Sequence, residues 1–179
     1  MRALALALGA AAVVGCASSG ASKTAPGAAN SGIARVSGGA VSTGAIPIAG
    51  ASTVAGSLDK LWAALPAVYD SVGIPVSTVD AASHLIGNRG LQIRRELGGA
   101  PLSRYIDCGY AQGRPSADFY DVNLSVTTQL ESQDSGTIRV VTTVDAVGRP
   151  VLFTGEYNHC GTKGALESKI SSLLEAAGR

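Results

Sequence analysis

The chain has 179 residues, which suits one domain with accessory segments. Its formal net charge is +1, so no strong electrostatic field attracts nucleic acid or an acidic substrate, and we expect no nucleic-acid partner. Aromatic residues make up only 4% and charged residues 15% of the chain, so the core must be built mainly from Val, Leu and Ile.

Residues 1–15 have the composition of an export signal. Met1 and Arg2 form a short basic segment, and an almost entirely apolar run follows over 3–14. A lasting membrane span takes about 20 apolar residues, so this run is too short to be one. Its length is that of the central segment of a signal peptide. We therefore expect residues 1–15 to be removed during export.

The apolar run ends in Val13, Val14, Gly15 and Cys16, which resembles the lipobox of bacterial lipoproteins. This resemblance implies cleavage after Gly15, a thioether-linked diacylglycerol on Cys16, and acylation of the freed amine. Two or more acyl chains anchor a protein stably where one does not. The mature second residue is Ala17 rather than Asp, which in diderm lipoproteins implies sorting to the outer membrane, facing the periplasm. The alternative is an ordinary secretory signal with an incidental cysteine.

Residues 16–44 follow the signal and are small, polar and rich in glycine, without apolar periodicity. They predict a flexible tether between the lipid and a domain over 45–179. The domain should begin with an edge strand over 45–53. A helix should follow, capped by Ser57 and ended by Gly73. Its apolar stripe consists of Leu58, Leu61, Trp62, Leu65, Val68, Tyr69 and Val72.

A β-hairpin is the clearest pattern in the domain. Residues at alternate positions over 120–130 and again over 138–146 are mainly apolar, polar residues lie between most of them, and a turn over 131–136 joins the two stretches. Weaker signals predict further strands over 74–79, 86–97, 105–108 and 151–157. Loops are expected over 98–104 and 110–115.

A second amphipathic helix is predicted at the C-terminus, capped by Thr162. Its apolar stripe consists of Leu166, Ile170, Leu173, Leu174 and Ala177. Two such helices and one apolar sheet face are most simply packed together. The predicted fold is therefore α+β, an antiparallel sheet of about four to five strands with both helices on one face.

The element order resembles the helix-grip domains of the lipoprotein component C of the β-barrel assembly machinery. The stretch from Leu61 to Asp80 carries this resemblance further, because a helix there runs into Gly73-Ile74-Pro75-Val76 and an acidic turn. The resemblance implies a fold and transfers no functional residue.

The three cysteines suggest one lipid attachment and one disulfide. With Cys16 acylated, Cys108 and Cys160 remain as an even pair in an oxidising compartment, which favours a disulfide. A metal site is the alternative, because His159 adjoins Cys160, but no CxxC or HExxH motif accompanies it. A catalytic thiol is a further alternative that export disfavours.

No motif marks a catalytic centre. His84 and His159 are the only histidines, and neither GxSxG nor a P-loop is present. We therefore expect no enzymatic activity, no cofactor and no metal. An envelope hydrolase using either histidine is the rival interpretation.

Arg89, Arg94, Arg95 and Arg104 form the densest basic cluster and are the candidate binding residues. They could contact anionic lipid headgroups, a glycan phosphate or the acidic patch of an envelope protein partner. The alternative is a solvated strand face balanced by nearby carboxylates.

Together these patterns predict a lipid-anchored cell-envelope protein with a non-enzymatic binding or scaffold role. Besides the hydrolase, a second alternative is a carrier that holds a small amphipathic ligand between the helices and the sheet.

Overall fold

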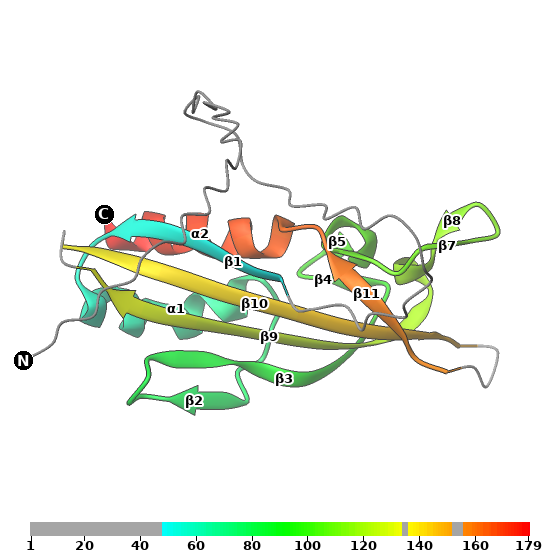
Figure 1. The fold of residues 1–179 in the computed structure, drawn as a ribbon, viewed down its shortest axis with the longest axis horizontal. Coiled ribbons are helices and arrows are strands. Elements are labelled where there is room, and N and C mark those ends of the chain that lie inside the picture. The colour runs from blue at the N-terminus through cyan, green and yellow to red at the C-terminus, as the bar shows by residue number, and fades with distance from the viewer. Residues whose placement is uncertain (1–47, 134–135, 152–155) are drawn as a thin grey trace, which may run out of the picture. The chain divides into compact units, whose positions relative to one another are not determined.

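A computed structural model describes residues 48–133, 136–151 and 156–179 (Figure 1). The predicted signal peptide, Cys16, the predicted tether and the predicted domain boundary at residue 45 lie outside the described residues. The described part is an α+β fold with an antiparallel sheet and two helices, as the sequence predicts. None of its helices is both long and apolar enough to cross a membrane.

A seven-stranded sheet forms the body of the domain (Figure 1). Its strands are β1 (Ile48–Ala55), β2 (Thr78–Asp80), β3 (Leu85–Arg94), β6 (Ile106–Asp107), β9 (Tyr120–Ser132), β10 (Thr137–Pro150) and β11 (Asn158–Thr162). The order is β2-β3-β9-β10-β11-β6, and every pair is antiparallel. Strand β1 pairs with the first part of β10, and β11 pairs with a later part.

The predicted hairpin is confirmed and is longer than the alternating pattern indicated. Strands β9 and β10 pair continuously from Ser132 with Ile138 to Tyr120 with Pro150. Side chains at alternate positions are buried on one face because successive residues of a strand point to opposite sides. The buried set is Val122, Leu124, Val126, Thr128 and Leu130 on β9, and Ile138, Val140, Thr142, Val144 and Ala146 on β10.

The structure has more strands than the predicted four to five. Several of the additional strands are only two residues long. Strands β4 (Glu96–Leu97) and β5 (Ala100–Pro101) pair with each other, as do β7 (Tyr110–Ala111) and β8 (Arg114–Pro115). Short 3₁₀ helices follow them at Leu102–Arg104 and Ser116–Asp118. Both predicted loops thus contain two-residue strands, which are too short to show any periodicity.

Three predicted strands differ from the observed ones. The strand expected over 74–79 reduces to β2, and the one over 86–97 divides at Arg95, whose φ of 71° ends β3. The strand expected over 151–157 falls partly on residues outside the described ranges, and β11 begins only at Asn158.

Helix α1 (Leu58–Ser71) begins and ends where the sequence predicts. The Ser57 hydroxyl accepts a hydrogen bond from the backbone N–H of Lys60 at 3.3 Å. Gly73 follows the helix with a φ of 77°, a conformation that glycine adopts without steric cost.

Helix α2 (Ala165–Gly178) begins later than predicted. Its cap is Gly164, with a φ of 74°, and not Thr162, which belongs to β11. The Thr162 hydroxyl instead accepts from the Gly164 N–H at 3.1 Å and donates to Glu167 at 2.7 Å. The cap prediction was therefore wrong because the threonine supports the turn before the helix.

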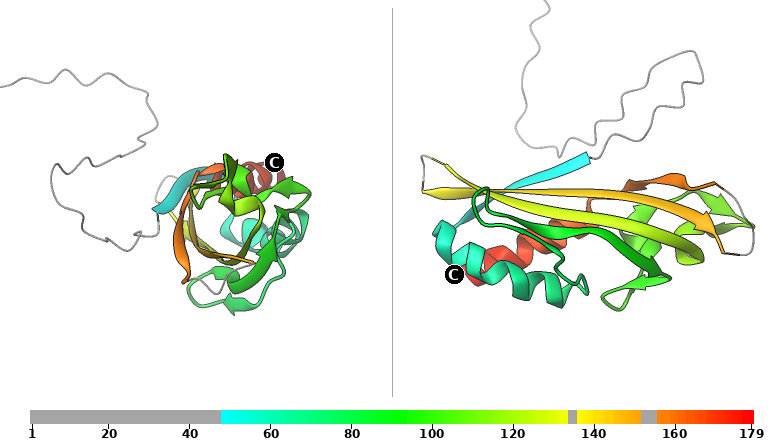
Figure 2. Two further views of the ribbon diagram at one scale, coloured as in Figure 1. Left: turned by 90° about the vertical axis from the view of Figure 1, so that its right-hand side faces the viewer. Right: turned by 90° about the horizontal axis from the view of Figure 1, so that it is seen from below.

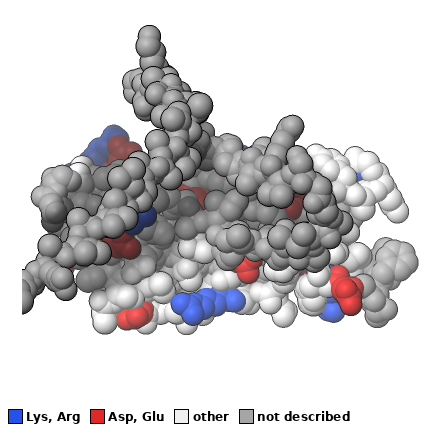
Figure 3. All heavy atoms as spheres, viewed as in Figure 1, with Lys and Arg blue, Asp and Glu red and all other residues white. Residues whose placement is uncertain are grey.

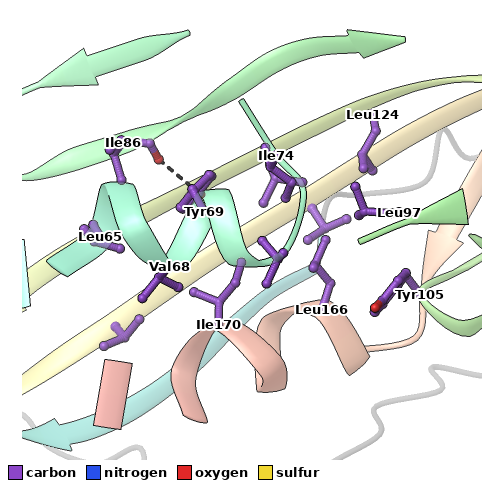
Figure 4. Close-up of a cluster of buried hydrophobic side chains, with 14 of the residues drawn as sticks. Leu65, Val68, Tyr69, Ile74, Ile86, Leu97, Tyr105, Leu124, Leu166 and Ile170 are labelled. Atoms are coloured by element: carbon purple, nitrogen blue, oxygen red, sulfur yellow. Dashed lines mark hydrogen bonds between the residues drawn. The ribbon is translucent and has the colours of Figure 1, made fainter. Parts of the chain in front are cut away.

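Both helices lie on the same face of the sheet (Figure 2). Apolar side chains fill the space between them and the strands (Figure 4). The largest side chains in this core that are less than 2% exposed include Leu61, Leu65, Tyr69, Ile74, Ile86, Leu97, Leu124, Leu166, Ile170 and Leu174. The aromatic-poor composition thus gives a core of Leu, Ile and Val, as expected.

A chain of buried hydroxyl groups crosses this core. The Tyr69 hydroxyl donates to the carbonyl oxygen of Ile86 at 3.2 Å (Figure 4) and contacts the Thr128 hydroxyl at 2.9 Å. Thr128 in turn contacts the hydroxyl of Thr142 at 3.0 Å. Burial raises the pKa of Tyr69 to about 12, although the hydrogen bond with Thr128 acts in the opposite direction. The neutral phenol is therefore the form that the fold stabilises.

This shift predicts a loss of stability at alkaline pH. Between about pH 10 and 12 the unfolded chain releases the Tyr69 proton while the folded chain keeps it. The free energy of unfolding should then fall by up to about 1.4 kcal/mol per pH unit through this group. In Tyr69→Phe this contribution should vanish. Urea unfolding at several pH values between about 9 and 12 measures this contribution. If the free energy of unfolding changed equally with pH in wild type and variant, the prediction would be contradicted.

Candidate functional site

The face of the sheet opposite the helices is polar. On β9 the side chains that alternate with the buried set are Asp121, Asn123, Ser125, Thr127, Gln129 and Glu131, and all are half-buried. We call this surface the open face. It carries no helix in the described part of the chain (Figure 2).

A hollow of about 310 Å³ lies at one end of the open face. The strand register places Arg94 of β3, Asp121 of β9 and Arg149 of β10 in one row across three neighbouring strands. The remaining lining residues are Gln92, Ile93, Val122, Asn123 and Tyr157. Residues from β3, β9, β10 and the segment before β11 thus meet in one place.

Arg94 and Asp121 form an ion pair at the centre of the row. The Arg94 Nε donates to Asp121 Oδ1 at 2.7 Å, and Nη2 lies 2.5 Å from the same oxygen. The two side chains are 50% and 35% exposed, so solvent screens the pair and it adds little stability. Its main effect is to hold both side chains in a fixed orientation.

Arg149 has a different environment from Arg94. Its guanidinium lies over the ring of Tyr157, 4.8 Å from the ring centroid, in a cation–π contact. Within the described ranges no carboxylate pairs with Arg149. Two arginines and one aspartate therefore give the described lining of the hollow one net positive charge.

The predicted disulfide is confirmed and lies behind this row. Cys108 and Cys160 are bonded, with Cα atoms 4.2 Å apart. A Cβ added at Gly148 would lie 3.2 Å from the Cys160 sulfur and 3.4 Å from the Cys108 sulfur. The sulfur atoms thus lie against β10 at the residue before Arg149. The disulfide ties β11 to the segment after β6.

The four predicted binding arginines do not form one group. Arg94 lines the hollow, whereas Arg104 lines a different hollow of about 430 Å³ together with Ser168 and Lys169 of α2. Arg89 and Arg95 are exposed and line neither hollow. On the face seen in Figure 3, the visible Lys and Arg side chains are separated from one another.

The two histidines have different surroundings. His84 makes an edge-to-face contact with Trp62, with ring centroids 5.5 Å apart, which gives it a packing role. His159 is exposed on β11, where it pairs with Val147, two residues before Arg149 on β10. Among the described residues no three His, Cys, Asp or Glu side chains are grouped as metal ligands.

Sequence reasoning missed Arg149 and Tyr157. Both lie outside the basic cluster, and only the pairing of β9, β10 and β11 brings them beside Arg94. No protein-family model matches this sequence, and no curated protein matches it. The functional interpretation therefore rests on the geometry of the hollow and on the N-terminal sequence.

Proposed function

We propose that this protein is a lipid-anchored cell-envelope protein, held through Cys16 in the outer membrane and facing the periplasm. The observation that carries the proposal is the disulfide between Cys108 and Cys160. Disulfides persist in exported proteins and are rare in the reducing cytosol. The disulfide therefore agrees with the export signal over 1–15, which is an independent feature of the sequence.

We further propose a non-enzymatic binding role for the domain, performed by the hollow at the end of the open face. Fixed polar side chains and an arginine without a carboxylate partner favour recognition of a ligand. A carrier that holds its ligand between helices and sheet would have to displace packed side chains such as Leu65 and Tyr69, which are fully buried. We therefore favour binding at the surface.

The fold itself is, in our proposal, of the helix-grip type, similar to the domains of the lipoprotein component C of the β-barrel assembly machinery. Support comes from the order of elements, with α1 before most of the strands and α2 at the end. Both helices also pack on the same sheet face. This likeness supports an envelope role and carries no residue across.

The anchor is tested by changing the cysteine that would carry it. Cys16→Ser removes the only thiol that the lipobox pattern offers, so the full chain should leave the outer-membrane fraction and accumulate as uncleaved precursor or soluble protein. Membrane fractionation with immunoblotting measures this. Ala17→Ser, which keeps the cysteine, is the control and should fractionate like wild type. A Cys16→Ser chain that is still processed and acylated would contradict the proposal.

A further inference from the structure

The hollow contains several hydrogen-bonding groups that the fold does not use. Arg94 binds the Oδ1 atom of Asp121, and no described residue donates a hydrogen bond to Oδ2. The side-chain amides of Gln92 and Asn123 have no hydrogen-bond partner in the described part of the chain, and each offers both donors and an acceptor. These groups come from two adjacent strands and face the same space.

Arg149 supplies a charge that Tyr157 orients and that no described carboxylate pairs with directly. The Tyr157 ring holds the guanidinium carbon 4.8 Å from its centroid, and no described residue accepts a hydrogen bond from the Arg149 N–H groups. A planar guanidinium whose N–H groups have no carboxylate partner can bind a carboxylate or phosphate with two parallel hydrogen bonds. The net positive charge of the hollow also favours an anion over a neutral or cationic ligand.

The acceptor beside this arginine limits which anions fit. An anion without hydroxyl groups has no proton to donate. It could bind Arg149, but its repulsion by the negatively charged Asp121 on the next strand would not be offset by a hydrogen bond. Hydroxyl groups both donate and accept, and adjacent hydroxyls can satisfy Asp121 Oδ2 and the amides of Gln92 and Asn123 together. A neutral polyol, in turn, would leave the charge of Arg149 unpaired.

We infer that the hollow binds an acidic sugar, a monosaccharide unit that bears a carboxylate or a phosphate. Arg149 would bind the acidic group, and Asp121, Asn123 and Gln92 would bind the hydroxyls. A volume of about 310 Å³ is at the small end of ligand pockets, as a single sugar unit requires. This inference rests on the binding role proposed above and specifies its ligand.

Isothermal titration of the purified full chain in detergent tests the inference. The probes are glucuronate and glucose 6-phosphate, with glucose and inorganic phosphate as the corresponding partial ligands. We expect at least one acidic sugar to bind about tenfold or more tightly than both partial ligands. Arg149→Gln should weaken that binding about tenfold.

Arg114→Gln is the matched control. Arg114 also lies over an aromatic ring, 5.9 Å from the centroid of Phe119, but outside the hollow. Its replacement causes the same change in net charge and should leave the affinity unaltered. If Arg149→Gln does not fold, Asn123→Ala serves instead, and it should reduce the preference for the acidic sugar over inorganic phosphate.

Three results would overturn the inference: no binding of either acidic sugar, equal binding of inorganic phosphate, or equal loss of affinity in Arg114→Gln. These outcomes are distinguishable from failure of the envelope proposal, because the titration uses purified protein and does not depend on Cys16 or on location. Conversely, a mislocalised Cys16→Ser chain should still bind the sugar.

Discussion

Replacing both Cys108 and Cys160 with Ala should lower the melting temperature by about 10–20 °C. The disulfide closes a loop of 52 residues. In the chain-entropy treatment, a loop of this size stabilises the folded state by about 4 kcal/mol. Strand β11 is otherwise held by three residue pairs to β10 and two to β6, so little else secures this end of the sheet.

Differential scanning calorimetry of oxidised protein measures this effect. The control is Cys16→Ser, which also removes a cysteine but leaves the disulfide intact and should melt like wild type. An unchanged melting temperature in the double variant would contradict the stabilising role. Alkylation of both thiols in protein prepared from the periplasm, without prior reduction, would show that the bond itself does not form there.

Gly87→Ala should destabilise the domain by about 3 kcal/mol. A Cβ built on Gly87 would lie 2.2 Å from the carbonyl oxygen of Val126 and 2.8 Å from the Cα of Thr127. Both are backbone atoms of β9, so a side-chain rotation cannot relieve the overlap. Strand β3 would have to move away from β9 along the pairing that carries the Arg94–Asp121 contact.

Gly90→Ala provides a control in the same strand. Gly90 lies in the irregular stretch between Asn88 and Leu91, and an added Cβ there meets nothing within 4 Å. Its replacement should change the free energy of unfolding by no more than about 0.5 kcal/mol. Urea denaturation compares the two variants. Equal midpoints for Gly87→Ala and Gly90→Ala would contradict the close approach of β3 and β9.

The elements that the sequence predicts well are those with many repeats of one period. The hairpin of β9 and β10 offers a long alternation, and α1 has both a hydroxyl cap at Ser57 and a stop at Gly73. Strand β11 is short and contains Gly161, so its alternation cannot be recognised. The two-residue strands depend on tertiary pairing and leave no pattern at all.

The candidate site was only partly predictable, because it too depends on how the strands pair. Arg94 was recognised because basic residues surround it in sequence, yet its relevant neighbours lie across the sheet. Alternation shows which face a side chain occupies but does not fix which residue stands opposite it on the next strand. Arg149 and Tyr157 therefore join the site only when the register is known. The disulfide was predictable because compartment and parity left a single pairing.

Mass spectrometry of the full chain isolated from the envelope of a diderm bacterial host tests the central proposal most directly. We expect a mature protein that begins at Cys16, carries a diacylglycerol and an N-linked acyl chain on that residue, and holds Cys108 bonded to Cys160. A chain that retains residues 1–15, or one that begins elsewhere and carries no lipid, would contradict the assignment of this protein as a lipid-anchored envelope protein.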